Sequence, residues 1–338
     1  MKDKCIIILE YGIPNYRSFI FDWFKRRFKK FVIIHSGERF NHKNNYKAHK
    51  GLNLRLFNDI SLCFFNVMKV KNFDFVISTL NFRKPHTWLP WFIFRKKKWI
   101  FWGQGPGKST NGVIGSLKKY IISNSHGYVV YTPEGKKELE NFGIESTKIS
   151  IAYNTLKIEN SEMTYGKDYL LYVGRIQDRK GLDKVLYALK NTSIKFVVVG
   201  EGGDYESEFK NLVLSLGLSK QVIFKGGIYE DQKLKSLFSN SIAYISPDHV
   251  GLGVVHAFAY GVPVIVGMNN DHAPEFSYCS KENSYIYEKD DDLSDVIYEV
   301  FENEKIRMEK KKNALKMYKE KLDPDNVLSA FDYHFNKA

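Results

Sequence analysis

Cysteine is scarce in this chain, which holds only three in 338 residues. Cys5, Cys63 and Cys279 lie far apart and lack the close spacing of a metal-binding motif. Cys5 and Cys63 fall within apolar runs, where a free cysteine usually packs as a small core residue. We therefore expect no disulfide framework, which suits a reducing compartment.

Long hydrophobic runs are also missing. The N-terminal segment MKDKCIIILEYG has five apolar residues before Glu10, fewer than the apolar region of a signal peptide. The aromatic stretch from Trp88 to Phe94 is far too short to span a bilayer. We expect a cytoplasmic protein, and a peripheral contact with the inner face of the membrane stays open.

Acidic residues are few in the first half of the chain. Residues 1–157 contain 28 lysines and arginines against 10 aspartates and glutamates, a net charge of +18. Residues 158–338 contain 23 against 28, a net charge of −5. The basic half should attract anions, which could be a phospholipid surface, a phosphorylated acceptor or a nucleic acid.

Length and charge asymmetry both predict two domains. The first half alternates β-rich runs with helical periodicity over Tyr16–Lys30, which is typical of a parallel, doubly wound sheet. The polar segment Asn154–Lys167 is the expected linker. The strands expected before it are Cys5–Glu10, Phe31–His35, Phe75–Thr79, Trp99–Trp102, Tyr128–Tyr131 and Ile149–Ala152.

A second α/β series follows the linker, and a last helix is expected over Asp325–Phe335, capped by Asp323 or Asp325. The expected strands of this series are Tyr169–Val173, Phe196–Gly200, Val222–Phe224, Ile242–Ser246 and Pro263–Val266. Its expected helices are Leu182–Lys190, Tyr205–Leu216, Glu230–Ser239 and Gly253–Tyr260.

Two motifs of the second half place special residues where strands end. In YVGRIQDRKG (Tyr172–Gly181), Arg175 and Lys180 suit a diphosphate, because arginine can grip it bidentately and a helix N-terminus adds amide donors. Taken alone, a solvated basic loop explains these cations better. In VVVGEGGDYESEF (Val197–Phe209), glycines let the backbone approach a phosphate or ribose, although a plain strand-to-helix turn accounts for them equally well.

A third motif, SPDHVGLGVVHAFAYGVPVIV (Ser246–Val266), holds Asp248 and His256 eight residues apart around a glycine-rich loop. Open α/β sheets bind ligands at such strand ends. Taken alone, a histidine on this helix is more often a core or cap residue than a ligand-binding one.

The order, spacing and β/α context of these motifs resemble the donor domain of GT-B glycosyltransferases of family 4. That family reads G-R-x4-K-G, V-G-x-G, V-x-F-x-G and E-x7-E ending in E-A-M-A-x-G-x-P-V-I. This chain reads GRIQDRKG, VGEGG, VIFKGG and DHVGLGVVHAFAYGVPVI. The resemblance covers residues 170–280 and is faint over residues 1–150.

The resemblance implies an α/β chain of the GT-B fold, with two Rossmann-like doubly wound domains facing a central cleft. Residues 1–155 would bind the acceptor and residues 165–318 the nucleotide-sugar donor. The C-terminal helix, about 322–338, would cross back to the N-terminal domain.

The resemblance also assigns roles to single residues. Arg175, Lys180 and Asp248 are the implied catalytic residues, the first two on the donor diphosphate and Asp248 at the first glutamate of E-x7-E, beside the sugar. His256 stands at the second glutamate, which usually holds the ribose, and a neutral imidazole can still hydrogen-bond a ribose diol. Glu275 could cover part of the altered role. The other implied donor-binding residues are Gly12, Gly200, Gly202, Gly227 (or Gly226), Gly251 and Leu252.

The acceptor side has three candidates, Gln104, Lys108 and His86. WIFWGQGPGKST (Trp99–Thr110) nearly matches a P-loop but is one residue too short. Gln104 stands where the family often has a histidine and cannot act as a base, while Lys108 could bind an acceptor phosphate. His86 could face the cleft, although a surface-loop histidine is the more ordinary interpretation.

Two segments interleave aromatic residues with cations, FKRRFKK (Phe24–Lys30) and WLPWFIFRKKK (Trp88–Lys98). Such segments can lie at an anionic membrane surface, bind nucleic acid, or be core aromatics beside a solvated face. Lipid-linked acceptors in the resembling family favour the membrane.

The acidic runs Asp290–Asp292 and Asp323–Asp325 suggest helix N-caps rather than a D-x-D metal motif. Enzymes of the GT-B class generally need no metal, so we expect neither a metal nor another cofactor.

The favoured hypothesis is thus a retaining glycosyltransferase, of the hexosyl or deoxyhexosyl class. It would move a sugar from a nucleotide diphosphate sugar to a hydroxyl of a glycan or lipid-linked acceptor in bacterial surface polysaccharide synthesis. One alternative is a nucleotide-sugar-binding protein without catalysis, because both glutamates of E-x7-E are replaced. Less favoured are a nucleic-acid-binding protein that uses the basic half and a dinucleotide oxidoreductase built on GEGG.

Overall fold

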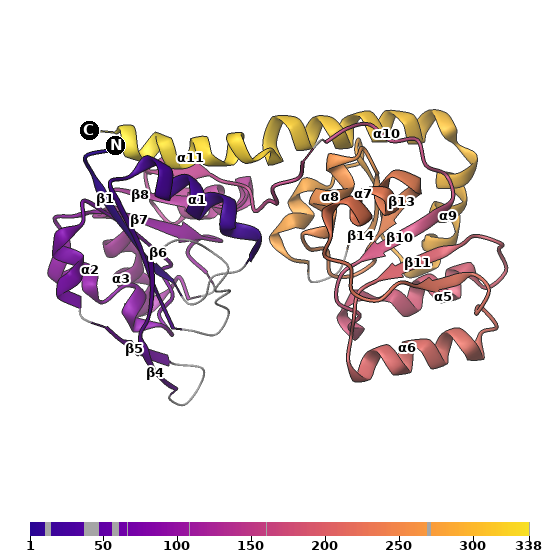
Figure 1. The fold of residues 1–338 in the computed structure, drawn as a ribbon, viewed down its shortest axis with the longest axis horizontal. Helices are drawn as coiled ribbons and strands as arrows, with labels where there is room; N and C mark the ends of the chain where they lie inside the picture. Colours follow the sequence, from indigo (N-terminus) through magenta and orange to yellow (C-terminus); the bar gives the residue numbers. More distant parts are fainter. Residues whose placement is uncertain are drawn as a thin grey trace. The chain divides into compact units, whose positions relative to one another are not determined.

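The chain folds into two compact α/β units (Figure 1). Unit 1 consists of Met1–Lys157 and Pro324–Ala338, and unit 2 of Ile158–Asp323. The structure, a computed structural model, describes residues 1–10, 15–36, 47–55, 61–65, 67–107, 109–159, 161–268 and 272–337. Each unit has its own parallel, doubly wound sheet, so the predicted fold class of two Rossmann-like domains is confirmed.

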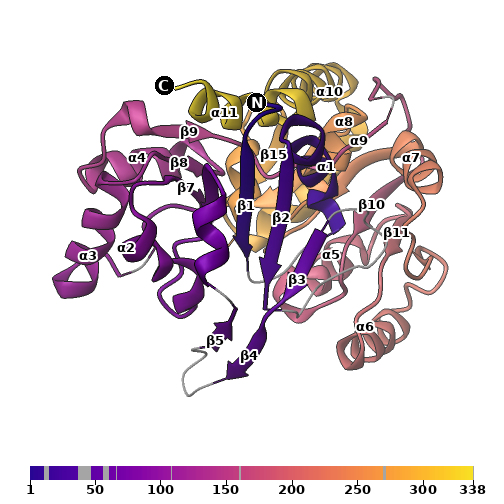
Figure 2. The same ribbon diagram turned by 60° about the vertical axis from the view of Figure 1, so that its left-hand side comes forward.

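Unit 1 is built on a seven-stranded parallel sheet with the order β3-β2-β1-β6-β7-β8-β9. A small antiparallel hairpin, β4 and β5, extends beyond the end of β3 (Figure 2). The strands are β1 (Cys5–Glu10), β2 (Lys30–His35), β3 (Lys47–Lys50), β4 (Leu52–Arg55), β5 (Ser61–Phe64), β6 (Phe75–Ser78), β7 (Lys98–Gly103), β8 (Gly127–Val130) and β9 (Ile149–Ile151). The six predicted strands are thus present within one or two residues at each end.

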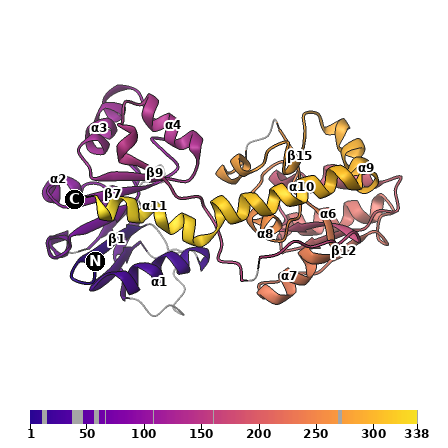
Figure 3. The same ribbon diagram turned by 90° about the horizontal axis from the view of Figure 1, so that it is seen from above.

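Helices cover both faces of this sheet, because its central strands are apolar on both sides. One face carries α1 (Ser18–Arg27) and α11 (Pro324–Asn336). The opposite face carries α2 (Pro90–Phe94), α3 (Gly112–Ser123) and α4 (Pro133–Asn141), as Figure 3 shows.

Helix α11, at the C-terminal end of the sequence, packs in the core of unit 1. This agrees with the prediction that the C-terminal helix crosses back to the N-terminal domain. The Phe331 ring meets Phe24 edge-on at 5.4 Å, and the Phe335 ring meets Phe28 at 5.1 Å. Arg27 of α1 also forms an ion pair with Asp332. The aromatic side chains of FKRRFKK are therefore core residues, which agrees with the prediction of core aromatics beside a solvated face.

Acid is expected to destabilise unit 1 through His334 of α11. Its ring is fully buried against Gly127 and hydrogen-bonds the Ser150 hydroxyl at 2.9 Å. Burial, aided by His126 and Lys337, lowers the pKa of His334 to about 4. Below pH 6.5 the unfolded chain binds a proton that the folded unit does not, so stability is lost as the pH falls from 6.5 towards 4. The loss between pH 7 and pH 5 should be on the order of 2 kcal/mol.

Urea unfolding followed by tryptophan fluorescence measures this loss selectively, since all five tryptophans belong to unit 1. A His334→Gln variant, with no titrating group at this position, should lose less stability over the same pH interval. An equal loss in both proteins would contradict the assignment to His334.

Unit 2 is built on a six-stranded parallel sheet with the order β12-β11-β10-β13-β14-β15. Its strands are β10 (Tyr169–Val173), β11 (Phe196–Val199), β12 (Val222–Phe224), β13 (Ser241–Ile245), β14 (Val264–Gly267) and β15 (Ser284–Tyr287). Its helices are α5 (Leu182–Leu189), α6 (Asp204–Ser215), α7 (Asp231–Asn240), α8 (Gly253–Ala259), α9 (Leu293–Glu302) and α10 (Glu304–Met317), which a π-helix over Tyr318–Leu322 extends.

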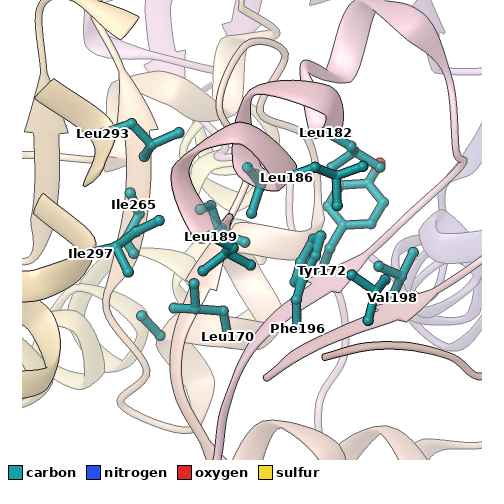
Figure 4. Packing of buried hydrophobic residues seen from close by; sticks show 14 of the residues in the cluster. Leu170, Tyr172, Leu182, Leu186, Leu189, Phe196, Val198, Ile265, Leu293 and Ile297 are labelled. Carbon is teal, nitrogen blue, oxygen red and sulfur yellow. The ribbon is translucent and has the colours of Figure 1, made fainter. Parts of the chain in front are cut away.

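Figure 4 shows how α5 closes one face of this sheet. Leu182, Leu186 and Leu189 form one apolar stripe, as the 3.6-residue period requires, and pack over Leu170 and Phe196 of the strands. Helix α9 adds Leu293 and Ile297 to the same cluster. The DDD run forms a 3-10 turn (Asp290–Asp292) directly before α9, and Asp292 Oδ2 accepts a hydrogen bond from the Lys289 amide at 3.2 Å, so its interpretation as a helix start is confirmed.

The strand order fixes where a ligand site can form in each unit. From β10 the chain moves outward through β11 and β12, and then returns to β13 on the other side of β10. The strand order therefore reverses between β10 and β13, and open α/β sheets bind ligands outside the carboxyl ends at such a point. In unit 1 the corresponding reversal lies between β1 and β6.

Candidate functional site

The loop after β10 brings the two predicted diphosphate-binding cations to the reversal point of unit 2. The Tyr172 hydroxyl donates to the Arg175 carbonyl at 2.7 Å and so fixes the start of the loop. The Arg175 side chain is exposed, and within the described part of the chain it forms no hydrogen bond or ion pair. Its guanidinium is therefore available to an anion from solution.

Lys180, in contrast, is buried and joins the two loops that meet at this point. Its Nζ donates to the carbonyl oxygen of His249, in the loop after β13, at 2.5 Å. Burial, with the charges of Arg179 and Arg175, lowers the pKa of Lys180 to about 8, and Glu275 opposes that shift. Glu275 is itself buried in the 3-10 helix Pro274–Tyr278, so three predicted site residues share one electrostatic environment.

The glycines of the loop after β11 are required by backbone packing. A Cβ at Gly200, whose φ is +144°, would lie 1.8 Å from the Gly174 carbonyl oxygen. A Cβ at Gly202 would lie 2.1 Å from the carbonyl oxygen of Ile176. Both glycines therefore let the β11 loop lie directly against the β10 loop that carries Arg175. A Cβ at Gly227 would lie 2.8 Å from the Glu201 carboxylate, which is the end of a flexible side chain, so packing requires glycine less strictly there.

Asp248 is held by a lysine that the sequence analysis missed. The Nζ of Lys184, in α5, lies 2.8 Å from Asp248 Oδ1 and 3.0 Å from Asp290 Oδ2. The other Asp248 oxygen packs over Gly181, where a Cβ would approach it to 2.4 Å. The carboxylate thus faces the start of α5. The spacing of Lys184, one helical turn after Lys180, was the only available sequence signal.

The loop from Asp248 to Leu252 is fixed at successive residues. The Arg179 guanidinium lies 2.9 Å from Nε2 of His249. The Val250 amide donates to Nδ1 of His272 at 3.2 Å, and the opposite nitrogen of that ring contacts the Gly267 carbonyl at 2.7 Å. Gly251 lies beside the Lys180 ammonium, and Leu252 is the residue directly before α8.

His256 lies on α8 and faces α7 rather than Asp248. Its ring stacks on Phe238 at 5.6 Å with an interplanar angle of 10°. Burial lowers the pKa of His256 to about 4, against a small opposing effect of Asp231, so the ring is neutral at pH 7. Among the described residues its buried Nδ1 has no hydrogen-bond partner. Asp248 and His256, at the two E-x7-E positions, therefore contact different helices. The ring at the second position is neutral and keeps one nitrogen without a described partner.

In unit 1, His86 is buried, so its interpretation as a surface-loop histidine is wrong. Its ring lies beside the Glu10 backbone, and burial, assisted by Lys84, lowers the pKa of His86 to about 4. Gln104 is exposed after β7, and its carbonyl packs against Gly135. The remaining two candidates, Gly12 and Lys108, lie outside the described residues.

A buried carboxyl–guanidinium pair at the reversal point of unit 1 was also missed. Arg17 lies 3.6 Å from the Glu10 carboxylate, donates to the Tyr131 hydroxyl at 2.6 Å, and covers the Trp102 ring at 4.3 Å. Burial raises the pKa of Glu10 to about 7, although Arg17 opposes the shift. A carboxylate that ends an otherwise apolar strand was the signal for this pair.

Neither a metal cluster nor a membrane span is found in the described part of the chain. No group of three or more His, Cys, Asp or Glu side chains there is arranged to hold a metal ion. The expected metal independence stays a prediction. No helix among these residues is both long and apolar enough to cross a bilayer. All three cysteines are free.

Comparison with known proteins places unit 2 in a functional class. Residues 155–317 match the model of the family described as Glycosyl transferases group 1. The chain therefore contains a glycosyltransferase group 1 domain, and its two parallel-sheet units define the GT-B type of fold.

Individual relatives point the same way. O-antigen chain mannosyltransferase C of Escherichia coli is 23% identical over 223 residues, which is 62% of this chain and 58% of that protein. D-rhamnosyltransferase WbpZ of Pseudomonas aeruginosa is 30% identical over 116 residues, 33% of this chain and 30% of that protein. Both alignments span less than two thirds of the relatives' length. Anabaena HepE, solved with UDP, has the same fold, with a TM-score of 0.76 at 12% identity over 99% of this chain and 100% of that chain.

Proposed function

We propose that this chain is a retaining glycosyltransferase. It moves a hexosyl or deoxyhexosyl group from a nucleotide diphosphate sugar to a hydroxyl of a glycan or lipid-linked acceptor, in the synthesis of a bacterial surface polysaccharide such as lipopolysaccharide. The observation that carries the proposal is the position of Arg175 and Lys180, one exposed and one buried, at the strand-order reversal of a glycosyltransferase group 1 domain.

In this proposal unit 2 binds the donor and unit 1 the acceptor. The diphosphate gathers negative charge as its bond to the sugar breaks, and fixed cations that meet this charge lower the barrier. Arg175 grips the diphosphate from solution, and Lys180 exchanges the His249 carbonyl for a phosphate oxygen. The leaving phosphate itself takes the acceptor proton, and no metal is needed.

The sugar and ribose ends of the donor meet residues that differ from the resembling family. His256 keeps a neutral imidazole at the position that usually holds the ribose, and its buried Nδ1 has to become exposed before it can bind a ribose hydroxyl. Glu275 supports Lys180 electrostatically. Asp248 can bind the donor sugar only if its carboxylate contacts the sugar and Lys184 together, or if the ion pair with Lys184 breaks.

The ion pair that holds the Asp248 carboxylate on Lys184 favours a second candidate function, a nucleotide-sugar-binding protein without catalysis. A thermal-shift screen of nucleoside diphosphates and their sugars tests binding, and release of the nucleotide with and without acceptor tests transfer. Stabilisation without acceptor-dependent release would select the second candidate. If no nucleotide shifts the unfolding of unit 2, both candidates are wrong.

We also propose that the protein works in the cytoplasm, in peripheral contact with the anionic inner face of the membrane, where a lipid-linked acceptor would be presented. The net charge of +18 on residues 1–157 supports this location.

Transfer should depend on pH through Lys180. Since its pKa is lowered to about 8 and its charged form is required, kcat/KM should fall about tenfold per pH unit above that value. A Lys180→Arg variant keeps its charge at every pH in this range, so its high-pH decline should disappear even if its maximum is lower. A pH–rate profile with the same high-pH decline in both proteins would contradict the role of Lys180.

A further inference from the structure

We propose that unit 1 docks on an anionic lipid surface through one face, formed by the 3-10 helix Val67–Asn72, α2 and α3. Its apolar part, here called the docking face, consists of Met68, Leu89, Phe92, Ile93, Val113 and Tyr120. The inference specifies the surface behind the proposed membrane contact, and it does not depend on the donor chemistry of unit 2.

The docking face exposes side chains that a water-facing helix rarely carries together. Ile93 is 64% exposed, Phe92 43% and Val113 86%. The adjacent Leu89 and Tyr120 are also about half exposed. Large apolar side chains exposed together on neighbouring elements of a folded domain mark a contact with a partner or a membrane.

Aromatic contacts join Phe92 of α2 and Tyr120 of α3 to one buried ring. The buried Trp91 ring packs edge-on against Phe92 at 5.2 Å and against Tyr120 of α3 at 5.8 Å. The 3-10 helix that carries Met68 packs beside α2. Because the Trp91 anchor is buried, the exposed side chains around it project from a fixed base.

The segment of the chain that carries the docking face has charges of almost one sign. Residues 65–123 contain eleven lysines and arginines and a single acidic residue, Asp74, whose carboxylate accepts a hydrogen bond from the Cys5 amide at 2.8 Å. Arg95 and Lys96 directly follow α2, are exposed, and form no ion pair within the described residues. The partner should therefore be an anion.

Aliphatic side chains decide between the possible anionic partners. A nucleic acid engages cations and stacks its bases on aromatic rings, but it offers little to Ile93 and Val113. An anionic bilayer accepts both components, because aliphatic and aromatic side chains enter the interface while lysine and arginine meet the lipid phosphates. A lipid surface thus fits the whole docking face.

Flotation of the full chain with lipid vesicles tests the proposal without any sugar substrate. Vesicles of phosphatidylcholine with phosphatidylglycerol should bind the protein at least about tenfold more strongly than phosphatidylcholine alone, and added salt should weaken the binding. Equal, negligible binding to both vesicles would overturn the proposal. So would retention by duplex DNA or RNA at physiological salt without vesicle binding.

Two pairs of substitutions separate the apolar and charged contributions. Phe92→Ser with Ile93→Ser, and separately Arg95→Gln with Lys96→Gln, should each weaken vesicle binding on the order of tenfold. The matched control is Leu214→Ser with Tyr298→Ser, which removes two similarly exposed side chains from unit 2 and should change nothing. Circular dichroism checks that every variant is folded. Wild-type binding by the folded Phe92/Ile93 variant would overturn the docking face, whereas failure of the transferase proposal would leave these results unaffected.

Discussion

Arg175→Ala is expected to slow sugar transfer by roughly a hundredfold to a thousandfold, the usual cost of losing one group that stabilises transition-state charge. The side chain is exposed and, within the described residues, bound to nothing, so its removal should leave the fold intact. Because the leaving diphosphate gains charge as the reaction proceeds, kcat should fall more than donor affinity. Steady-state kinetics and a donor titration measure the two effects separately.

Lys195→Ala is the matched control for this variant. Lys195 is also an exposed cation of unit 2, but it precedes β11 and so lies at the opposite end of the strands from Arg175. This control should transfer sugar at the wild-type rate. Unchanged turnover in Arg175→Ala, with the true donor and acceptor, would show that the site has been wrongly assigned.

Gly200→Ala is expected to destabilise unit 2 by roughly 3–5 kcal/mol, since it adds backbone strain and overpacking at one position. The new Cβ would meet the Gly174 carbonyl oxygen, a backbone atom that cannot move without shifting β10 and the Arg175 loop. Donor binding should weaken with it. Urea unfolding followed by circular dichroism should show the loss, while tryptophan fluorescence, which reports on unit 1, should not change.

The Gly203→Ala variant separates backbone strain from overpacking. Gly203 lies in the same loop with φ of +58°, but no atom lies within 4 Å of the position that its Cβ would take. This variant should therefore lose only the cost of placing alanine in a backbone conformation that glycine favours, roughly 1–3 kcal/mol. If both alanine variants were equally stable, the close approach of the β10 and β11 loops would not require glycine.

The sequence predicted unit 2 well because its strands are buried on both faces and appear as short apolar runs. Tyr169–Val173 and Val222–Phe224 have the predicted bounds. In unit 1, β3 was missed because it is an exposed edge strand, KAHK, and becomes a strand only by pairing with β2. Such pairing depends on tertiary contacts that a local pattern does not contain.

The same distinction applies to the candidate site. Positions such as Arg175 and Lys180 could be predicted because their spacing from strand and helix is local. The Lys184–Asp248 ion pair joins residues 64 positions apart, and the stacking of His256 on Phe238 joins two helices. Partners of this kind are set by packing, so the sequence named the residues but not their contacts.

The position of α11 has a consequence for the order of folding. Unit 2 is one continuous segment, and it can close its core as soon as residues up to Asp323 have left the ribosome. The core of unit 1 needs Val327, Phe331 and Phe335, which are translated after all of unit 2. The half of the protein that is made first is thus expected to finish folding last, and its apolar β1, β2 and β6 strands remain open to chaperones while unit 2 is synthesised.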